Sequence, residues 1–254
     1  MWAKGRMIIC TVLVWAISGV TVSWAGDGVK PIDRCQTIQV GDRSTFVLVK
    51  NLFSSGGDCL VINSSDVTLD LEGFTINGSG TGRGITSSAS VYNVTVRNGT
   101  VRAFAVGVSL GGNGNVVENV RIADNTDTGL FLGAGSLARN LIVQGNFQFG
   151  VILSTACTMK DSIVRANGNS ALSIGLSAGP GSTVTGNTIW ANIGTGLFGS
   201  TGGTVIGNTV LDTIGLGISV ICPANILQNT ATANPGGNLV LNGIGCNVDN
   251  NVAP

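Results

Sequence analysis

Apolar residues alternate with polar ones along this chain, and the alternation recurs inside a longer repeat. The segments Thr185–Ser200 (TGNTIWANIGTGLFGS) and Ile206–Ile221 (IGNTVLDTIGLGISVI) can be laid over each other, with Thr185 on Ile206. A fixed period of roughly 20 to 50 residues is typical of repeat architectures. Aligning each repeat on the residue three places before a central apolar residue gives a nearly constant spacing. These anchor residues are Gly73, Asn98, Asn119, Asn140, Asp161, Gly186, Gly207 and Gln228.

Each repeat is predicted to contain three short strands, because its apolar residues follow a period of two rather than the 3.6-residue period of a helix. The third strand begins at a glycine or small residue and continues as an apolar triplet such as Leu130-Phe131-Leu132. Asparagine tolerates the left-handed backbone region and hydrogen-bonds its own turn, so asparagines that recur at one bend are expected to stack. That expected stack contains Asn125, Asn146, Asn167, Asn192 and Asn234, interrupted by Thr213.

Stacked coils of three strands predict an all-β, single-stranded, right-handed parallel β-helix of about eight coils, spaced ~4.8 Å apart. The segments LDLEGFTI (Leu69–Ile76), VRNGTV (Val96–Val101) and GNVVENVRIADN (Gly114–Asn125) resemble exported right-handed parallel β-helix repeat proteins of the pectate-lyase-like superfamily. The resemblance covers residues 33–254 approximately. It implies the fold but not the activity, because that superfamily includes lyases, hydrolases, epimerases, sugar-binding modules and adhesins.

The N-terminus has the pattern of a signal peptide. Lys4 and Arg6 precede an apolar run over residues 7–22, and Ser23-Trp24-Ala25 places small residues where a signal peptidase would cut. Cleavage after Ala25 predicts a secreted or periplasmic protein with no stable membrane insertion. An uncleaved membrane anchor is the alternative, although the apolar run is at the short end for spanning a bilayer.

The predicted organisation is therefore a signal peptide over residues 1–25, an N-terminal cap segment over residues 26–64 and a parallel β-helix domain over residues 65–254. Loss of Lys4 and Arg6 leaves 11 basic residues against 13 acidic ones, a net charge of −2. Such a balance provides no basic surface for nucleic acid. The 39 glycines, with only 10% charged residues, fit a turn-rich all-β solenoid.

Five cysteines follow the predicted cleavage site, and export permits disulfides. Cys35 and Cys59 flank the segment before the first regular coil, where a bridge would fasten the cap over an otherwise open edge strand. Cys222 and Cys246 lie in consecutive terminal coils and form the second predicted pair. Cys157 is left over and is predicted to be a buried, unreactive thiol.

Charged side chains precede the first five anchors and form the first candidate site. These residues are Glu72, Arg97, Glu118, Arg139 and Lys160. One interpretation is a cross-strand ladder of alternating charges, which stabilises the sheet only slightly. The other is a face that binds glycans or carries acid and base groups.

Aromatic side chains provide a second candidate site. Phe131 and Phe198 fall at the middle, outward position of the third strand, and Trp190 projects from the second strand. They could form a platform on which sugar rings stack. The alternative is that they are scattered apolar residues of a kind found on most protein surfaces.

Catalytic residues stay unassigned. Glu72 and Glu118 would lie ~10 Å apart with Arg97 between them, which is outside the carboxyl spacing of glycosidases. The resemblance implies that lyases of the superfamily bind Ca²⁺ in a cluster of acids, whereas Asp124 and Asp127 stand alone here. The hydrolase branch uses a Gly-His-Gly motif, and this sequence contains no histidine. No metal or cofactor is expected, except Ca²⁺ if the protein is a lyase.

Three functions remain open from the sequence. The first is a secreted, non-catalytic β-helix that binds a polysaccharide, a cell-surface glycan or another surface through an outward strand face. The second is a carbohydrate-active enzyme, a polysaccharide lyase or epimerase. The third is an ice-binding solenoid, for which Thr188, Thr209 and Thr230 provide one short threonine rank.

Overall fold

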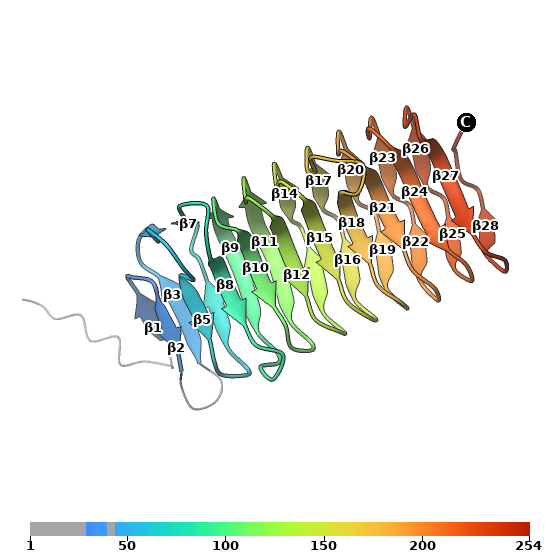
Figure 1. Cartoon of the computed structure of the whole chain (residues 1–254). Helices are drawn as coiled ribbons and strands as arrows, with labels where there is room; N and C mark the ends of the chain where they lie inside the picture. The colour runs from blue at the N-terminus through green and yellow to red at the C-terminus, as the bar shows by residue number, and fades with distance from the viewer. Residues whose placement is uncertain (1–28, 40–43) are drawn as a thin grey trace, which may run out of the picture.

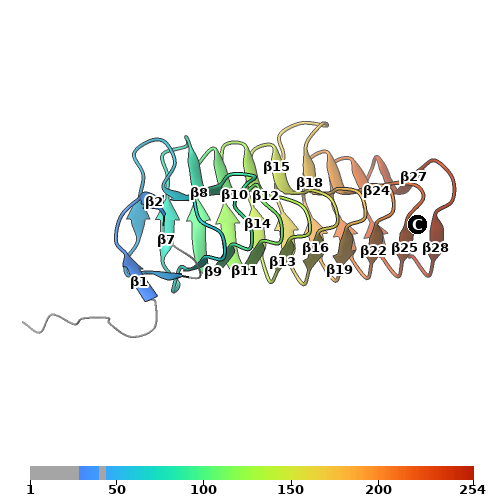
Figure 2. The ribbon, with the colours of Figure 1, turned by 90° about the horizontal axis from the view of Figure 1, so that it is seen from below.

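A computed structural model of the protein describes residues 29–39 and 44–254; the predicted signal peptide lies outside this range. The described residues form 28 strands that wind around one core as a right-handed parallel β-helix (Figures 1 and 2). Each coil contributes its first and second strands to an 18-stranded sheet and its third strand to a ten-stranded sheet. The described part of the chain therefore has ten coils, compared with about eight predicted. No helix able to cross a membrane occurs among the described residues.

The strands are short and recur in a fixed order. The first strands are β1 (Val29–Ile32), β3 (Thr45–Leu48), β6 (Thr68–Asp70), β13 (Leu137–Arg139), β16 (Thr158–Lys160), β19 (Thr183–Thr185), β22 (Thr204–Ile206), β25 (Asn225–Leu227) and β28 (Asn247–Asp249). The second strands are β4 (Leu52–Phe53), β7 (Thr75–Asn77), β14 (Ile142–Gln144), β17 (Ile163–Arg165), β20 (Thr188–Trp190), β23 (Thr209–Leu211) and β26 (Thr230–Thr232). In two coils the first and second strands are continuous, as β9 (Thr95–Arg102) and β11 (Val116–Ala123).

The third strands make up the ten-stranded sheet. They are β2 (Gln36–Ile38), β5 (Leu60–Ile62), β8 (Arg83–Ser87), β10 (Val106–Leu110), β12 (Thr128–Leu132), β15 (Phe149–Leu153), β18 (Ile174–Ala178), β21 (Thr195–Gly199), β24 (Leu216–Ile221) and β27 (Gly237–Asn242). The segment that the sequence analysis set apart as a cap contributes β1 to β5 to the same two sheets. These N-terminal strands account for the additional coils.

The core consists of apolar side chains stacked from coil to coil. Val117, Ala138 and Met159 lie opposite one another on neighbouring first strands, and each is fully buried. Alternation of side chains across a strand places every second residue inside the coil. The period-two pattern in the sequence is therefore the pattern of core positions.

The repeat anchors predicted from the sequence are the corners between first and second strands. Asn98, Asn119, Asn140 and Asp161 all have a positive φ, between 53° and 60°. Asparagine, aspartate and glycine occupy this left-handed region at lower cost than other residues. The chain can turn there within one residue, which explains why the anchor positions recur so regularly.

The predicted asparagine stack is confirmed at the corner between second and third strands. Asn125, Asn146 and Asn167 are at most 1% exposed. The amide Nδ2 of Asn125 donates to Oδ1 of Asn146 at 2.7 Å, and Asn146 donates to Asn167 at 2.8 Å. A second stack, which the sequence analysis missed, lies at the corner after the first strands and contains Asn187, Asn208, Asn229 and Asn251. Its signal was the recurring tripeptide Gly-Asn-Thr at residues 186–188 and 207–209.

Replacing Thr213 with asparagine is expected to stabilise the protein by about 1 kcal/mol, because an amide would complete the stack. Thr213 is fully buried and its hydroxyl has no hydrogen-bond partner in the described part of the chain. The matched control is Thr188→Asn on the exposed face, which should change stability by less than about 0.5 kcal/mol. Urea unfolding measures both. An unchanged or lower stability for Thr213→Asn would contradict this account.

The cysteines pair as predicted from the sequence: Cys35 is bonded to Cys59 and Cys222 to Cys246. Both bridges join neighbouring coils, at a sequence separation of 24. Cys157 is free and buried. Its thiol donates to the carbonyl of Gly133 at 3.2 Å, and burial raises its pKa, so the reactive thiolate is disfavoured.

Candidate functional site

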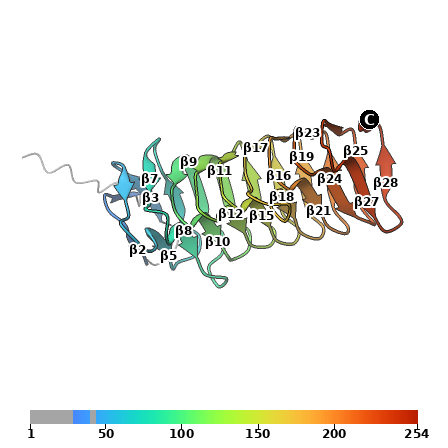
Figure 3. The same ribbon diagram turned by 45° about the horizontal axis from the view of Figure 1, so that its top comes forward.

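The eight predicted ligand-binding residues are divided among the first, second and third strands of the coils. Figure 3 shows these three rows of strands. Four of the charged residues lie on first strands and Glu72 lies just after one, Trp190 is on second strand β20, and Phe131 and Phe198 are on third strands β12 and β21. The structure therefore does not bring them together into one site. Each face has to be considered separately.

On the first-strand face, Asp70 occupies the position beside Arg97 that was predicted for Glu72. Asp70 lies opposite Arg97 in the sheet, whereas Glu72 is exposed at a left-handed corner with φ of 46°. The reason is an insertion between two strands. Leu69 pairs with Val96 and Ile76 pairs with Val101, so the earlier coil has two extra residues between these paired positions. The prediction that Glu72 lies beside Arg97 was wrong, because it assumed the same number of residues between the first and second strands in every coil.

Asp70 is a buried carboxylate whose partners are all supplied by its own and the next coil. It is 3% exposed and accepts a hydrogen bond from Nε of Arg97 at 2.7 Å. The amide of Asn98 donates to both of its oxygens at 3.1 Å, and the backbone N–H of Glu72 donates at 3.0 Å. A buried charge is tolerated when it is paired and hydrogen-bonded in this way. Asp70 therefore holds the inserted corner against the following coil.

Glu118, the second acid of the charged stack, is also paired with an arginine. Glu118 accepts a hydrogen bond from Nε of Arg139 at 2.7 Å, and Lys160 follows Arg139 in register on the next strand. Beside them the corner amides form a chain, because Asn140 donates to Asn119 at 3.2 Å and Asn119 donates to Asn98 at 3.3 Å. Both acids of this stack are engaged by arginines, which is the geometry of the cross-strand charge ladder.

The second-strand face combines basic and apolar groups. The guanidinium of Arg165 lies 5.4 Å from the centroid of the Trp190 ring and also donates to Oε1 of Gln144 at 2.7 Å. This cation–π contact covers part of the tryptophan. The threonines Thr188 and Thr209 are in register with Thr230, and Ile163 precedes them in the same stack.

The outward face of the ten-stranded sheet carries no charged side chain from β10 to β27, and we call it the uncharged face. Its partly exposed side chains form two stacks. The first is Val106, Phe149, Ile174, Thr195 and Leu216, and the second is Ser109, Phe131, Ile152, Ser177, Phe198 and Val240. Aromatic and aliphatic groups therefore alternate with hydroxyls along this face.

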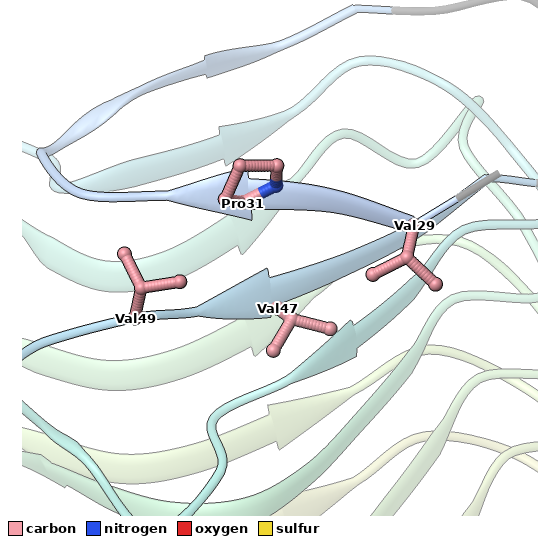
Figure 4. A pocket seen from close by; sticks show the side chains of 4 residues that line it. All are labelled: Val29, Pro31, Val47 and Val49. Carbon is pink, nitrogen blue, oxygen red and sulfur yellow. The ribbon is translucent and has the colours of Figure 1, made fainter. Parts of the chain in front are cut away.

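The surface of the described residues has a small apolar hollow and a larger open groove. The hollow, of about 50 Å³, lies between β1 and β3, lined by Val29, Pro31, Val47 and Val49 (Figure 4). It is roughly the size of one or two water molecules. The open groove, of about 400 Å³, lies at the corners after β11 and β14, where Asp124 and Phe147 face it.

Acidic groups are sparse in the described part of the chain. No three residues of the types histidine, cysteine, aspartate and glutamate gather there as metal ligands would. Asp124, which the sequence analysis noted together with Asp127, pairs with Arg102 at 3.1 Å.

These two sheets and their one-residue corners define a right-handed parallel β-helix protein. The sequence matches the family described as "Right handed beta helix region" over residues 14–179 and 106–253, and the chain belongs to this family. The comparison with curated proteins gives no match.

Among solved structures, the chain is similar to the Dettilon tailspike protein, with a TM-score of 0.60 and 12% sequence identity. The match covers 87% of this chain and 60% of the tailspike, so this chain spans less than two thirds of that protein. It is also similar to the A-modules of the Azotobacter vinelandii mannuronan C-5 epimerases AlgE4 and AlgE6, each with a TM-score of 0.54. Their identities are 13% and 15%, with 78% and 90% of this chain and 72% and 81% of theirs covered. Such distant likeness shows a shared fold only.

Proposed function

We propose that this protein is an exported, non-catalytic binding protein for a neutral polysaccharide, which it holds on the uncharged face. The observation that carries the proposal is the set of Phe131, Phe149 and Phe198 among serine and threonine hydroxyls on strands β10 to β27 of the ten-stranded sheet, which carry no charged side chain. Phe131 and Phe198 are three strands apart, or ~14 Å at ordinary strand spacing. An extended oligosaccharide along the solenoid axis would reach both rings.

The composition of the face supports a neutral ligand. An acidic polymer would be held by arginine or lysine, and none lies on the strands from β10 to β27 of the ten-stranded sheet. Only two charged residues, Asp212 and Asp249, follow Arg165 in the whole chain. Aromatic rings contribute apolar contact area for the C–H faces of sugars, and hydroxyls both donate and accept hydrogen bonds.

The same composition supports binding without catalysis. General acid–base catalysis needs a titratable group within hydrogen-bond reach of the reacting atoms. The strands of the uncharged face provide no such group. On the first-strand face, Asp70 and Glu118 are engaged by Arg97 and Arg139, so they are better suited to holding the coils together.

Two further observations support the proposal. The tailspike and the mannuronan epimerases share the fold, and the epimerases act on a polysaccharide by name. Two disulfides in one domain fit an oxidising compartment outside the cytosol, in line with the predicted signal peptide over residues 1–25.

Loss of the two aromatic rings is expected to weaken binding at least tenfold without destabilising the fold. Affinity electrophoresis of the mature protein through gels containing neutral glucan, mannan or xylan measures binding, with polygalacturonate as the acidic comparison. The test variant is Phe131→Ala with Phe198→Ala, and the matched control is Phe53→Ala, whose ring is 65% exposed on a different face. The proposal would be supported if a neutral polymer retards the unaltered protein and Phe53→Ala but not the double variant.

Two results would overturn it. One is retardation by polygalacturonate alone. The other is the release of unsaturated uronate, followed by absorbance with and without Ca²⁺, which would favour the alternative of a polysaccharide lyase.

A further inference from the structure

The groove at the corners after β11 and β14 is separate from the uncharged face and has its own chemistry. It is lined by Asp124, Asn125, Thr126, Gly145 and Phe147 and has a volume of about 400 Å³. This volume is within the range of small-molecule sites. These corners are the turns that lead into β12 and β15, along the upper edge of the view in Figure 1.

One of the residues that line the groove is a glycine at a left-handed corner. Gly145 has a φ of 64° and follows Asp124 in the stack of left-handed corners. A Cβ atom on Gly145 would lie 2.8 Å from Oδ1 of Asp124. Oδ1 of Asp124 therefore lies beside Gly145, where any side chain in place of the glycine would crowd it.

The groove has one exposed aromatic wall. Phe147 is 57% exposed, although its backbone is fixed by an N–H bond to the carbonyl of Asn125 at 2.9 Å. The next residue in its stack is Gly168, which itself has no side chain. An exposed aromatic ring on an ordered backbone loses little conformational entropy when a ligand packs against it.

The polar side of the groove has unused acceptors and no net charge. Oδ2 of Asp124 pairs with Arg102 at 3.1 Å, while Oδ1 has no hydrogen-bond partner among the described residues. The hydroxyl of Thr126 donates to the carbonyl of Gly80 at 2.8 Å, which leaves its lone pairs free to accept. Arg102 balances the carboxylate, so a charged ligand gains no net attraction there.

We propose that this groove binds one or two neutral pyranose rings, with a C–H face against Phe147 and ring hydroxyls donating to Asp124 and Thr126. A pyranose presents an apolar face and several hydroxyl donors, which matches a site made of one aromatic wall and acceptor oxygens. The proposal does not rest on polysaccharide binding by the uncharged face, because the groove is formed by different residues. The two sites can fail independently.

Saturation-transfer NMR with neutral disaccharides tests the proposal, because a disaccharide is too short to span Phe131 and Phe198. The probes are maltose, cellobiose, mannobiose and xylobiose at millimolar concentration, with digalacturonate as the acidic comparison. We expect at least one neutral probe to bind the mature protein at least tenfold more tightly than digalacturonate. The same probe should bind the Phe131→Ala, Phe198→Ala double variant unchanged.

Two groove variants and one control complete the test. Phe147→Ala should weaken binding of that probe at least tenfold, and so should Gly145→Asn, because asparagine tolerates a positive φ and would crowd Oδ1 of Asp124. Phe53→Ala, which removes another exposed ring, should leave binding unchanged. Circular dichroism verifies the fold of each variant. Absence of saturation transfer from every neutral probe, or equal binding by Phe147→Ala and the unaltered protein, would overturn the proposal.

Discussion

Replacing Asn167 with alanine is expected to lower the free energy of unfolding by about 3–5 kcal/mol, because several buried polar groups lose their partners at once. Asn167 is 0% exposed. Its Oδ1 accepts from the backbone N–H and the side-chain amide of Asn146 at 3.0 and 2.8 Å. Its Nδ2 donates to Oδ1 of Asn192 at 3.0 Å and to the carbonyl of Val143 at 3.2 Å.

The matched control is Asn113→Ala, at an exposed corner, where the change should be within about 0.5 kcal/mol. Urea unfolding followed by circular dichroism measures both variants. The loss of unfolding free energy in Asn167→Ala should not depend on salt concentration, because the lost hydrogen bonds join neutral amides and carbonyls. Similar stability of the two variants would mean that the stacked amides contribute no more than a surface asparagine does.

Replacing Asp70 with alanine is expected to cost about 2–4 kcal/mol, because it removes the acceptor for Arg97, Asn98 and the backbone N–H of residue 72. The guanidinium of Arg97 is left with no carboxylate, although its side chain is 40% exposed and water recovers part of the loss. The inserted corner would also lose the hydrogen bond that fixes it. Thermal unfolding should therefore begin at a lower temperature.

Glu72→Ala is the decisive control for Asp70, since it removes an acid at the neighbouring corner. Glu72 is exposed there, and its removal should change stability by less than about 0.5 kcal/mol. Equal costs for the two variants, or a larger cost for Glu72→Ala, would show that the register between β6 and β9 is not the one described. Chemical denaturation at one fixed ionic strength measures the unfolding free energies of both variants under the same electrostatic screening.

The regular part of the fold could be predicted because each coil repeats the same local requirements. Corners at Asn119 and Asn140 need residues that accept a positive φ, and inward positions such as Val117 need apolar side chains. Both requirements act within a few residues along the chain, so they leave a period in the sequence. The predicted number of about eight coils is close to the ten observed, and the two further coils come from the N-terminal strands β1 to β5, which follow this pattern less strictly.

The candidate sites were less predictable, because they depend on which residues lie side by side in neighbouring coils. Asp70, and not Glu72, lies opposite Arg97 because two extra residues are inserted between β6 and β7. Only the sheet register shows where this insertion lies. The groove was missed because its parts are common residues, Gly145 and Phe147 among them, that become a site only when two corners stack. The uncharged face was partly visible, since Phe131 and Phe198 had already been placed outward on third strands.

The amino-acid sequence alone predicted the repeat, the three strands of each coil, the asparagine stack before the third strands and the two disulfide pairs. The repeat, the strands and the asparagine corners arise from backbone conformation and from the burial of alternate side chains, which act locally, whereas the disulfide pairs were indicated by cysteines about one coil apart. The tertiary structure alone decided that the predicted ligand-binding residues are divided among three faces, that Asp70 is the buried partner of Arg97, and that Asp124 and Phe147 share a groove. The physical reason is that contacts between coils join residues 21 to 28 positions apart, so a short insertion changes the neighbours without disturbing the pattern within each strand.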